Sequence, residues 1–328
     1  MPSSSFDPLG IQYGRYHHQR CRPASCQREG RSHDRYATLT ISPHLTLLTT
    51  NSKGGSSGIG LATVNLLLSL GATVVNGDLN PPSELPSSNY TYIPTNVTSW
   101  DSLVSLFTQT LALHTHIDHV FANAGIRPST DYINLLTSST GIPLEPNHLT
   151  LDVNLKGCIN TSSLALHYFQ KQPPPADGGN YSLVLTCSPS SYARFRAADY
   201  GVSKHGVLGL LRGLQPVTFP ALPIRVNALC PGWTPTALTL QSHYAGVKVN
   251  LSTPENNAKA AVLLMADENR HGHMVLSVGN EFREVEEAVL LAAMTKEVRG
   301  QELTEDEICE QVIANSMREA EEADAAQA

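Results

Sequence analysis

Strand-like and helix-like segments alternate along the chain from Leu45 to Leu229. Residues 59–70 have helical character and end at Gly71, a residue suited to the left-handed conformation that closes a helix. The apolar segment that follows predicts a strand ending near Asp78. Chains that alternate such elements fold into a parallel sheet covered by helices on both faces. We therefore predict an α/β fold of one domain, a doubly wound parallel sheet in three αβα layers, over residues 45–290.

The same periodicity predicts the other elements of this sheet. Thr98 or Ser99 is placed to cap a helix that carries Leu103, Phe107 and Leu111 on one face. Further strands are predicted over residues 117–122, 183–186, 224–229 and 275–278, and further helices over residues 149–170, 200–214 and 257–266.

The two ends of the chain differ from this middle part in composition. Residues 1–44 are rich in Arg, Ser, His and Gln without apolar periodicity, so we expect an irregular or disordered extension rather than a targeting signal. Residues 291–328 predict an acidic helical tail. From Glu281 to Ala328 the chain holds 14 acidic and 4 basic residues, which more than accounts for its net charge of −7. Because no basic stripe is present, nucleic acid is not an expected partner.

The cysteine spacing and the length of the apolar runs indicate the cellular compartment. The six cysteines form no CxxC pair, and the N-terminal segment lacks the apolar stretch of a signal peptide, so we expect a reducing, cytoplasmic location. No apolar run approaches the roughly 18 residues of a membrane span, so no membrane partner is expected. Cys158, Cys187 and Cys230 lie in apolar surroundings, which predicts small buried residues rather than nucleophiles.

A glycine-rich turn, Lys53-Gly-Gly-Ser-Ser-Gly-Ile-Gly60, precedes the first predicted helix. Small residues there let backbone N–H groups approach a pyrophosphate at the positive end of the helix, although a flexible linker has a similar composition. Asp78 stands 20 residues beyond Gly58, where an acidic side chain accepts hydrogen bonds from an adenosine ribose and repels a 2′-phosphate. The combination predicts a site that favours NAD(H) over NADP(H). Its candidate contacts in the turn are Gly54, Ser56, Ser57, Gly58, Ile59 and Gly60.

Tyr200 and Lys204 stand one helical turn apart. A phenol, whose unperturbed pKa is about 10, works as a general acid or base near neutrality only when its phenolate is stabilised. An ammonium four residues along the same helix face provides that stabilisation. The spacing Tyr-x-x-x-Lys is common by chance, so its weight depends on Ser188 upstream and on the turn at Gly54.

At these motifs the chain resembles the short-chain dehydrogenase/reductase family, over residues 45–290. The glycine spacing is that of the compact branch of the family and disfavours its epimerase and dehydratase branch. The matching segments occur in the family's order: Gly54-x-x-x-Gly58-x-Gly60, Asn96-Val97, Asn123-Ala124-Gly125, Asp152 to Gly157 with Asn154, Ser188, Tyr200-x-x-x-Lys204, and Pro231-Gly232-Trp233-Thr234-Pro235-Thr236.

The resemblance implies a Rossmann-like oxidoreductase that uses NAD, or alternatively NADP, on a small-molecule secondary alcohol or ketone. It also implies a homodimer or homotetramer. Tyr200 would exchange a proton with the substrate oxygen, which Ser188 would hydrogen-bond, while Lys204 would contact the nicotinamide ribose and Asn154 would anchor a relay water. The implied cofactor contacts outside the glycine-rich turn and Asp78 are Asn96, Val97, Asn123, Ala124, Gly125, Tyr200, Lys204, Pro231, Gly232, Thr234 and Thr236.

Three positions depart from the family pattern. Lys53 replaces a Thr, and residues 49–52 are polar where a buried strand is usually apolar, which leaves open an NAD(P)-binding sensor or scaffold without turnover. Asn96 replaces the usual Asp but keeps its hydrogen-bonding capacity. The 12-residue separation of Ser188 from Tyr200 is one shorter than usual. Counting back from Tyr200 selects Cys187, whereas alignment on the preceding strand selects Ser188, which we favour.

A histidine cluster raises a metal site as an alternative. His114, His116 and His119 lie close to Asp118 in the sequence, but they fall at a helix end where exposed polar residues are expected. We predict no metal site.

Two loops are expected to determine the substrate, which we predict to be apolar. These are residues 126–148 and 233–254, and within the second Trp233 and Tyr244 are placed to shape an apolar pocket, although Trp233 suits core packing equally well.

Overall fold

The structure is a computed structural model that describes residues 46–51, 56–83, 88–173, 175, 179–236 and 238–298, with isolated positions between 300 and 315. The extension predicted over residues 1–44, Gly54 of the glycine-rich turn, and most of the tail predicted over residues 291–328 lie outside the described residues.

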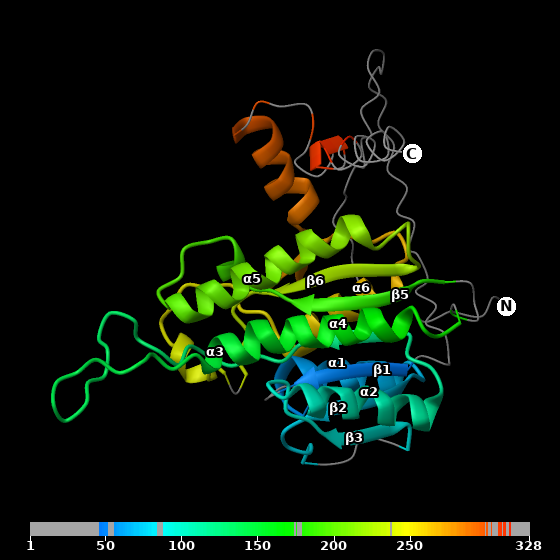
Figure 1. Cartoon of the computed structure of the whole chain (residues 1–328), viewed down its shortest axis with the longest axis horizontal. Coiled ribbons are helices and arrows are strands. Elements are labelled where there is room, and N and C mark those ends of the chain that lie inside the picture. The colour runs from blue at the N-terminus through cyan, green and yellow to red at the C-terminus, as the bar shows by residue number, and fades with distance from the viewer. Residues whose placement is uncertain are drawn as a thin grey trace, which may run out of the picture.

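Within these residues, eight strands form one sheet in the order β3-β2-β1-β4-β5-β6-β7-β8. All neighbouring strands run parallel except β7 and β8, which are antiparallel. This confirms the predicted doubly wound sheet (Figure 1). The strands are β1 (Thr46–Asn51), β2 (Thr73–Asp78), β3 (Tyr90–Pro94), β4 (His119–Ala122), β5 (Tyr181–Thr186), β6 (Ile224–Pro231), β7 (Met274–Val278) and β8 (Glu281–Glu284).

The polar segment at residues 49–51 belongs to the central strand β1. Its backbone pairs with β2 on one side, where Asn51 is in register with Asp78, and with β4 on the other. Main-chain hydrogen bonds to two neighbours specify this strand independently of side-chain polarity. The polar composition of residues 49–51 therefore does not prevent the first strand from forming.

Helices cover both faces of the sheet (Figure 1). Along each strand, successive side chains point to opposite faces. Val74 accordingly packs in the cluster under one set of helices and Val75 in the cluster under the other, and Phe121 and Val120 divide in the same way. One face carries α1 (Gly58–Ser69) and α6 (Pro254–Ala266), and the other carries α2 (Trp100–His114), α4 (Gly157–Phe169) and α5 (Ala198–Leu214).

Most predicted elements are confirmed with shifts of a few residues at their ends. Gly71, with φ of +87°, follows α1 as expected. Ser99 caps α2 by accepting a hydrogen bond from the Ser102 amide. The predicted helix over residues 149–170 is continuous but contains a π-helical turn, η1 (Asp152–Lys156), between the short α3 (Leu149–Leu151) and α4.

Two strands are absent from the sequence prediction. β3 is a five-residue edge strand that ends at Pro94, and β8 is a four-residue strand with alternating exposed positions. Short edge strands carry too few apolar residues to give a period-two pattern. After β8 the chain becomes helical at Glu286, in the π-helical segment η5 (Glu286–Leu291).

The segment after β8 is held to the body of the protein by an ion pair whose carboxylate is buried. Glu286 is only 1% exposed, and its carboxylate receives hydrogen bonds from Arg212 on α5 at 2.5 and 3.2 Å. No helix among the described residues has the length and apolar character needed to cross a bilayer.

The packing of α2 on the sheet gives a direct stability test. Leu106 is fully buried, and a Cβ added to Gly77 of β2 would lie 2.6 Å from one of its methyl groups, so helix and strand are in close contact. Leu106→Ala should lower the free energy of unfolding by about 2–5 kcal/mol in urea titrations. Leu113→Ala on the same helix, where the side chain is 58% exposed, should change it by less than about 0.5 kcal/mol. Equal effects would contradict this packing.

Candidate active site

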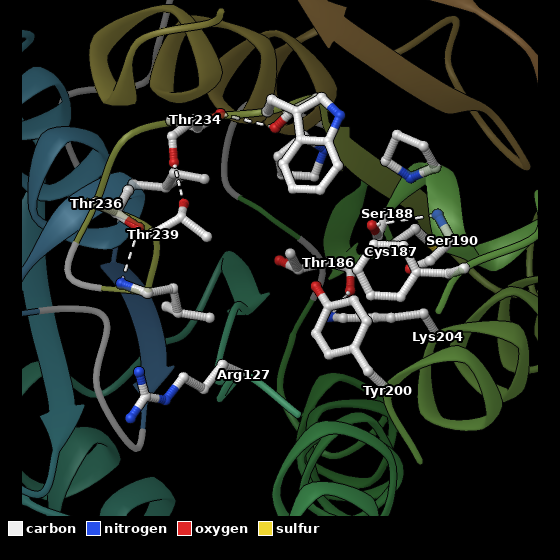
Figure 2. Close-up of a pocket in the computed structure, with 18 of the residues that line it drawn as sticks. Arg127, Thr186, Cys187, Ser188, Ser190, Tyr200, Lys204, Thr234, Thr236 and Thr239 are labelled. Carbon is white, nitrogen blue, oxygen red and sulfur yellow. Dashed lines mark hydrogen bonds between the residues drawn. The ribbon is translucent and has the colours of Figure 1, made fainter. Parts of the chain in front are cut away.

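A cavity of about 350 Å³ opens at the carboxyl ends of β4, β5 and β6, beside the start of α1 (Figure 2). The strand order reverses between β1 and β4, and ligands of doubly wound sheets bind at such a switch point. Residues from the start of α1, from the segments that follow β4, β5 and β6, and from α5 line this cavity. The catalytic and cofactor residues predicted from sequence that line it are Ser57, Gly58, Ile59, Asn123, Gly125, Ser188, Tyr200, Lys204, Pro231, Gly232, Thr234 and Thr236, and the predicted pocket residues Trp233 and Tyr244 line it as well.

Helix α5 brings Tyr200 and Lys204 to the cavity together (Figure 2). The Lys204 side chain is only 3% exposed, and its Nζ donates a hydrogen bond of 2.7 Å to the main-chain carbonyl of Thr186 at the end of β5. The same Nζ lies 5.7 Å from the centre of the Tyr200 ring. The ammonium is therefore held beside the phenol by an acceptor on the sheet.

Ser188 is fixed at the N-terminus of the short helix η2 (Pro189–Ser191). Its Oγ accepts a hydrogen bond from the Ser190 amide at 3.3 Å, and its own amide donates to Ser191 Oγ at 3.2 Å. Such a reciprocal capping arrangement fixes the rotamer of the N-cap serine. The Ser188 hydroxyl thus has a defined position on the cavity wall.

Cys187, the alternative to Ser188, also borders the cavity but is only 1% exposed. Burial raises the pKa of its thiol to about 11, although the nearby Lys204 charge acts in the opposite direction. Burial likewise raises the pKa of Cys158 to about 12 and that of Cys230 well above its ordinary value. All three thiols therefore remain protonated near neutrality, as expected for small buried residues.

Asn154 lies in the π-helical turn η1, behind the cavity wall. Its Oδ1 accepts a hydrogen bond from the Ile126 amide at 2.8 Å, and its Nδ2 donates to the Ile126 carbonyl at 3.0 Å and to Ser203 Oγ at 3.4 Å. The side chain thus joins the segment after β4 to α5. An added Cβ at Gly125 would lie 3.6 Å from Asn154 Oδ1 and 3.9 Å from Lys204 Nζ, which places Gly125 between these two side chains.

The start of α1 forms the opposite wall. Gly58 has a φ of +54°, and a Cβ at this position would lie 3.2 Å from the methyl group of Thr236. Only glycine fits both the backbone conformation and this approach. Because the first N–H groups of a helix lack partners within it, this wall offers donors and a positive dipole end to a phosphate group. Gly60 is buried within α1 and does not border the cavity.

Asp78 is nearly buried at the end of β2. Its carboxylate accepts hydrogen bonds from the amides of Ser56 at 3.0 Å and Asn80 at 3.1 Å, and Ser56 Oγ donates to the Asn80 carbonyl at 2.6 Å. A negative charge is thus fixed beside the glycine-rich turn, although Asp78 and Ser56 do not border the cavity.

The predicted Asn-Val pair lies away from the cavity. Asn96 is exposed, and its Oδ1 accepts hydrogen bonds from the Thr98 amide at 3.0 Å and the Thr98 hydroxyl at 2.9 Å. Val97 is fully buried against Gly157 of α4. Ala124 is buried as well, while Asn123 reaches the cavity and accepts a hydrogen bond from Thr186 Oγ1 at 3.2 Å.

The segment after β6 forms the wall of the cavity that faces the start of α1. The Gly232 amide donates to the Ser277 carbonyl at 2.8 Å, and a Cβ on Gly232 would clash with that oxygen. Thr234 Oγ1 donates to the Gly232 carbonyl at 2.9 Å and accepts from Asn257 Nδ2 on α6 at 3.0 Å. These contacts fix Thr234 and Thr236 opposite the start of α1.

Together these walls fit a nicotinamide dinucleotide. The start of α1 and the Thr236 hydroxyl, which accepts a hydrogen bond from the Leu238 amide and keeps its own O–H, offer donors for a pyrophosphate. Lys204 and Tyr200 offer polar groups for a nicotinamide ribose. Gly58 and Gly125 leave the backbone open to close approach.

The structure adds site residues that sequence analysis missed. Phe195 and Arg194 border the cavity, and they belong to a loop without periodicity or motif, so no sequence signal identified them. Arg127 at the start of the predicted substrate loop 126–148 also borders the cavity, whereas the part of that loop after Pro128 does not and runs out from the body (Figure 1).

Asp199 is a further missed residue, immediately before Tyr200 and fully buried. Its carboxylate accepts hydrogen bonds from the amides of Ser129 at 2.8 Å, Thr130 at 3.2 Å and Tyr200 at 2.7 Å. Burial alone would raise the pKa of Asp199, but these bonds and one from Thr150 outweigh it and lower the pKa below its ordinary value. Asp199 thus ties the first turn of α5 to the loop after β4.

The side chains of the histidine cluster at residues 114–119 do not come together around one point. His116 Nε2 lies 2.8 Å from Asp118 Oδ1, while His119 is buried in the sheet, where burial and then the Arg225 charge lower its pKa to about 3. Over the described part of the chain, no three His, Cys, Asp or Glu side chains are grouped as a metal site would need.

Comparisons with known proteins agree with this fold. The family model described as short chain dehydrogenase matches residues 52–245. The short-chain dehydrogenase/reductase ascJ of Acremonium egyptiacum is 44% identical over 247 residues, which cover 75% of this chain and 83% of that protein. The NADP-dependent dehydrogenase M3 of a Phoma species is 31% identical over 192 residues, 54% of this chain and 57% of that protein. Among solved structures, levodione reductase superposes with a TM-score of 0.60 at 22% identity, covering 72% of this chain and 96% of its own.

The role of Asp199 can be tested through stability and its pH dependence. Asp199→Asn should lower the free energy of unfolding by about 1–3 kcal/mol at pH 7, because the amide oxygen is a weaker acceptor for the three N–H groups that donate to Asp199. Since the folded-state pKa is depressed, the stabilisation by the carboxylate is complete above the ordinary value of 3.8 and is lost as the pH falls through the folded-state pKa. Urea titrations at decreasing pH should show the gap between wild type and variant closing in acid. Asp101→Asn, at an exposed aspartate on α2, is the control, and a gap independent of pH would contradict this role.

Proposed function

The chain belongs to the short-chain dehydrogenase/reductase family, and from that premise we propose that it is an NAD-dependent oxidoreductase that interconverts a secondary alcohol and its ketone. The observation that carries this proposal is the convergence of Tyr200, Lys204 and Ser188 on one cavity whose opposite wall is the start of α1. A proton-exchanging phenol, a fixed ammonium and a phosphate-binding helix end are the groups this reaction needs.

Residues on both walls would hold the cofactor. Ser57, Gly58 and Ile59 face the position of the pyrophosphate, and Thr234 and Thr236 close over it from the segment after β6. Lys204 Nζ has three N–H donors, and one of them donates to the Thr186 carbonyl. The other two can donate to ribose hydroxyls. A bound nicotinamide cofactor supplies the hydride in reduction and accepts it in oxidation.

Tyr200 is the proposed general acid and base. In ketone reduction its hydroxyl donates a proton to the substrate oxygen, and in alcohol oxidation its phenolate takes that proton back. The ammonium of Lys204, 5.7 Å from the ring centre, stabilises the phenolate form.

Ser188 is the proposed second contact to the substrate oxygen. Because its Oγ accepts a hydrogen bond from the Ser190 amide, its own O–H remains available to donate. A donor fixed by the protein stabilises negative charge on the oxygen without reorganisation.

Asn154 completes the proposed site as the anchor of a relay water. Both N–H groups of its side chain already donate, one to the Ile126 carbonyl and one to Ser203 Oγ. The relay water would therefore donate a hydrogen bond to an oxygen atom of Asn154. A π-helical turn such as η1 is frequent at functional positions in helices.

NAD is the proposed cofactor because of Asp78. Its carboxylate is fixed beside the glycine-rich turn by Ser56 and Asn80, and a charge held there disfavours the 2′-phosphate of NADP. NADP remains the alternative, since a relative bears the name NADP-dependent dehydrogenase.

The role of Tyr200 predicts a separation of turnover from binding. Tyr200→Phe should lower kcat by about 10²- to 10⁴-fold, because the proton donor is lost while the ring stays in place. The NADH dissociation constant, measured by fluorescence titration, should be nearly unchanged. Tyr168→Phe, outside the cavity, is the matched control. Wild-type turnover in Tyr200→Phe would remove this residue from the mechanism.

The role of Asp78 predicts a change in cofactor preference. The wild type should bind NADH more tightly than NADPH, and Asp78→Asn should reduce that ratio by about tenfold, because the charge opposing the 2′-phosphate is removed while a hydrogen-bond acceptor is kept. Parallel titrations of both proteins with both cofactors measure the ratio. A ratio that stays the same after substitution would count against the assigned position of the adenosine ribose.

A further inference from the structure

A continuous series of aromatic rings extends outward from Tyr200. The Phe195 ring centre lies 5.5 Å from that of Tyr200 and 6.2 Å from that of Trp233, and Trp233 in turn lies 6.0 Å from Tyr244. Phe195 precedes α5, Trp233 follows β6, and Tyr244 ends the short helix η4 (Gln241–Tyr244). All of these rings border the cavity, so two separate segments build one aromatic wall.

Much of this aromatic surface is unburied. Phe195 is 39% exposed and Trp233 is 49% exposed, although both contact other rings. Contiguous exposed apolar surface beside a cavity with a few polar groups is typical of ligand sites. The wall therefore has room for another flat ring, in the offset or edge-to-face contacts that aromatic pairs prefer.

The charged residues that border the cavity are Arg127, Arg194 and Lys204, and among the described lining residues none is acidic. Lys204 is engaged with the Thr186 carbonyl. Figure 2 shows the Arg127 side chain on the same side of the cavity as Thr236 and Thr239. It is directed away from Tyr200, toward the part of the cavity proposed to hold the cofactor. Arg194 also borders the cavity, and it immediately precedes Phe195 in the chain.

Arg194 is available to an anion. Within the described part of the chain its guanidinium takes part in none of the ion pairs, which involve other residues. A planar guanidinium recognises a carboxylate or an ionised phenol through charge-assisted hydrogen bonds.

From these observations we propose that the wall of Phe195, Trp233 and Tyr244, together with Arg194, is a subsite for an aromatic ring that carries an anionic group. The substrate is then an aryl ketone or aryl secondary alcohol with a carboxylate or phenolate on its ring. The ring lies against Phe195 and Trp233, its anion meets Arg194, and its carbonyl reaches Tyr200. This inference rests on the proposed function for the reaction and adds the class of substrate.

Matched ketones separate the two features of the subsite. The carboxylate para-acetylbenzoate and the neutral para-acetylbenzamide have nearly the same shape and differ in charge, while acetophenone and cyclohexyl methyl ketone differ in the flatness of the ring. For each compound, both the dissociation constant from the enzyme–NADH complex, by calorimetry, and kcat/KM, by NADH absorbance, are measured.

The wild type should bind the carboxylate about ten- to a hundredfold more tightly than the amide, as expected for a charge-assisted contact. It should also prefer acetophenone to its cyclohexyl counterpart. Arg194→Gln should remove the preference for the carboxylate, whereas Arg196→Gln, at an exposed arginine two residues further on and outside the cavity, should keep it.

Trp233→Leu should weaken binding of every aryl compound. Trp100→Leu is its matched control, because Trp100 has the same exposed fraction, 49%, at the start of α2 and does not border the cavity. A neutral amide bound as tightly as the carboxylate, or a preference that survives Arg194→Gln, would overturn the subsite.

The two readouts distinguish failure of the subsite from failure of the proposed reaction. Binding of the carboxylate that depends on Arg194, without NADH oxidation, would support the subsite and contradict the reaction. Efficient reduction of all four ketones without preference would support the reaction and overturn the subsite. Failure of the aryl compounds to bind the NADH complex would also overturn it.

Discussion

The buried ammonium of Lys204 is the constraint around which the site is built. A charge that is 3% exposed is costly to bury unless it is hydrogen-bonded, and its partner is the Thr186 carbonyl at the end of β5. This bond fixes how α5 lies on the sheet. Because Tyr200 precedes Lys204 by one helical turn, fixing the lysine also fixes the phenol at the cavity.

The parallel sheet supplies the rest of the site through the geometry of its strand ends. The segments after β4, β5 and β6 all emerge at the same edge as α1 begins, and each is held by a local contact: Asn154 with Ile126, Ser188 with Ser190, and Thr234 with Asn257. Rigid elements position these groups, while the more exposed aromatic and cationic residues come from the loops. Cofactor binding and substrate choice thus depend on different parts of the chain.

Sequence patterns were sufficient for the helices, the central strands and the local motifs. The Tyr200–Lys204 pair lies within α5, and Gly58 lies at the start of α1. Each of these motifs falls within one element, so its spacing is visible directly in the sequence. The edge strands β3 and β8, Asp199 and Phe195 were missed, because each depends on contacts between distant segments. Trp233 and Tyr244, the other members of the aromatic wall, were predicted to shape an apolar pocket. Alignment on the preceding strand favoured Ser188 over Cys187, and the burial of Cys187 supports that choice, which stays a prediction. Gly54 stays a prediction outside the described residues.

The most direct test of this account replaces the central charge. Lys204→Met keeps most of the length of the side chain and removes its charge. Circular dichroism and thermal unfolding verify that the fold survives. If Lys204 both binds the nicotinamide ribose and stabilises the Tyr200 phenolate, the variant should bind NADH more weakly in titration. It should also lose ketone reduction at saturating NADH. A folded Lys204→Met protein that binds NADH and reduces ketone as the wild type does would contradict the account.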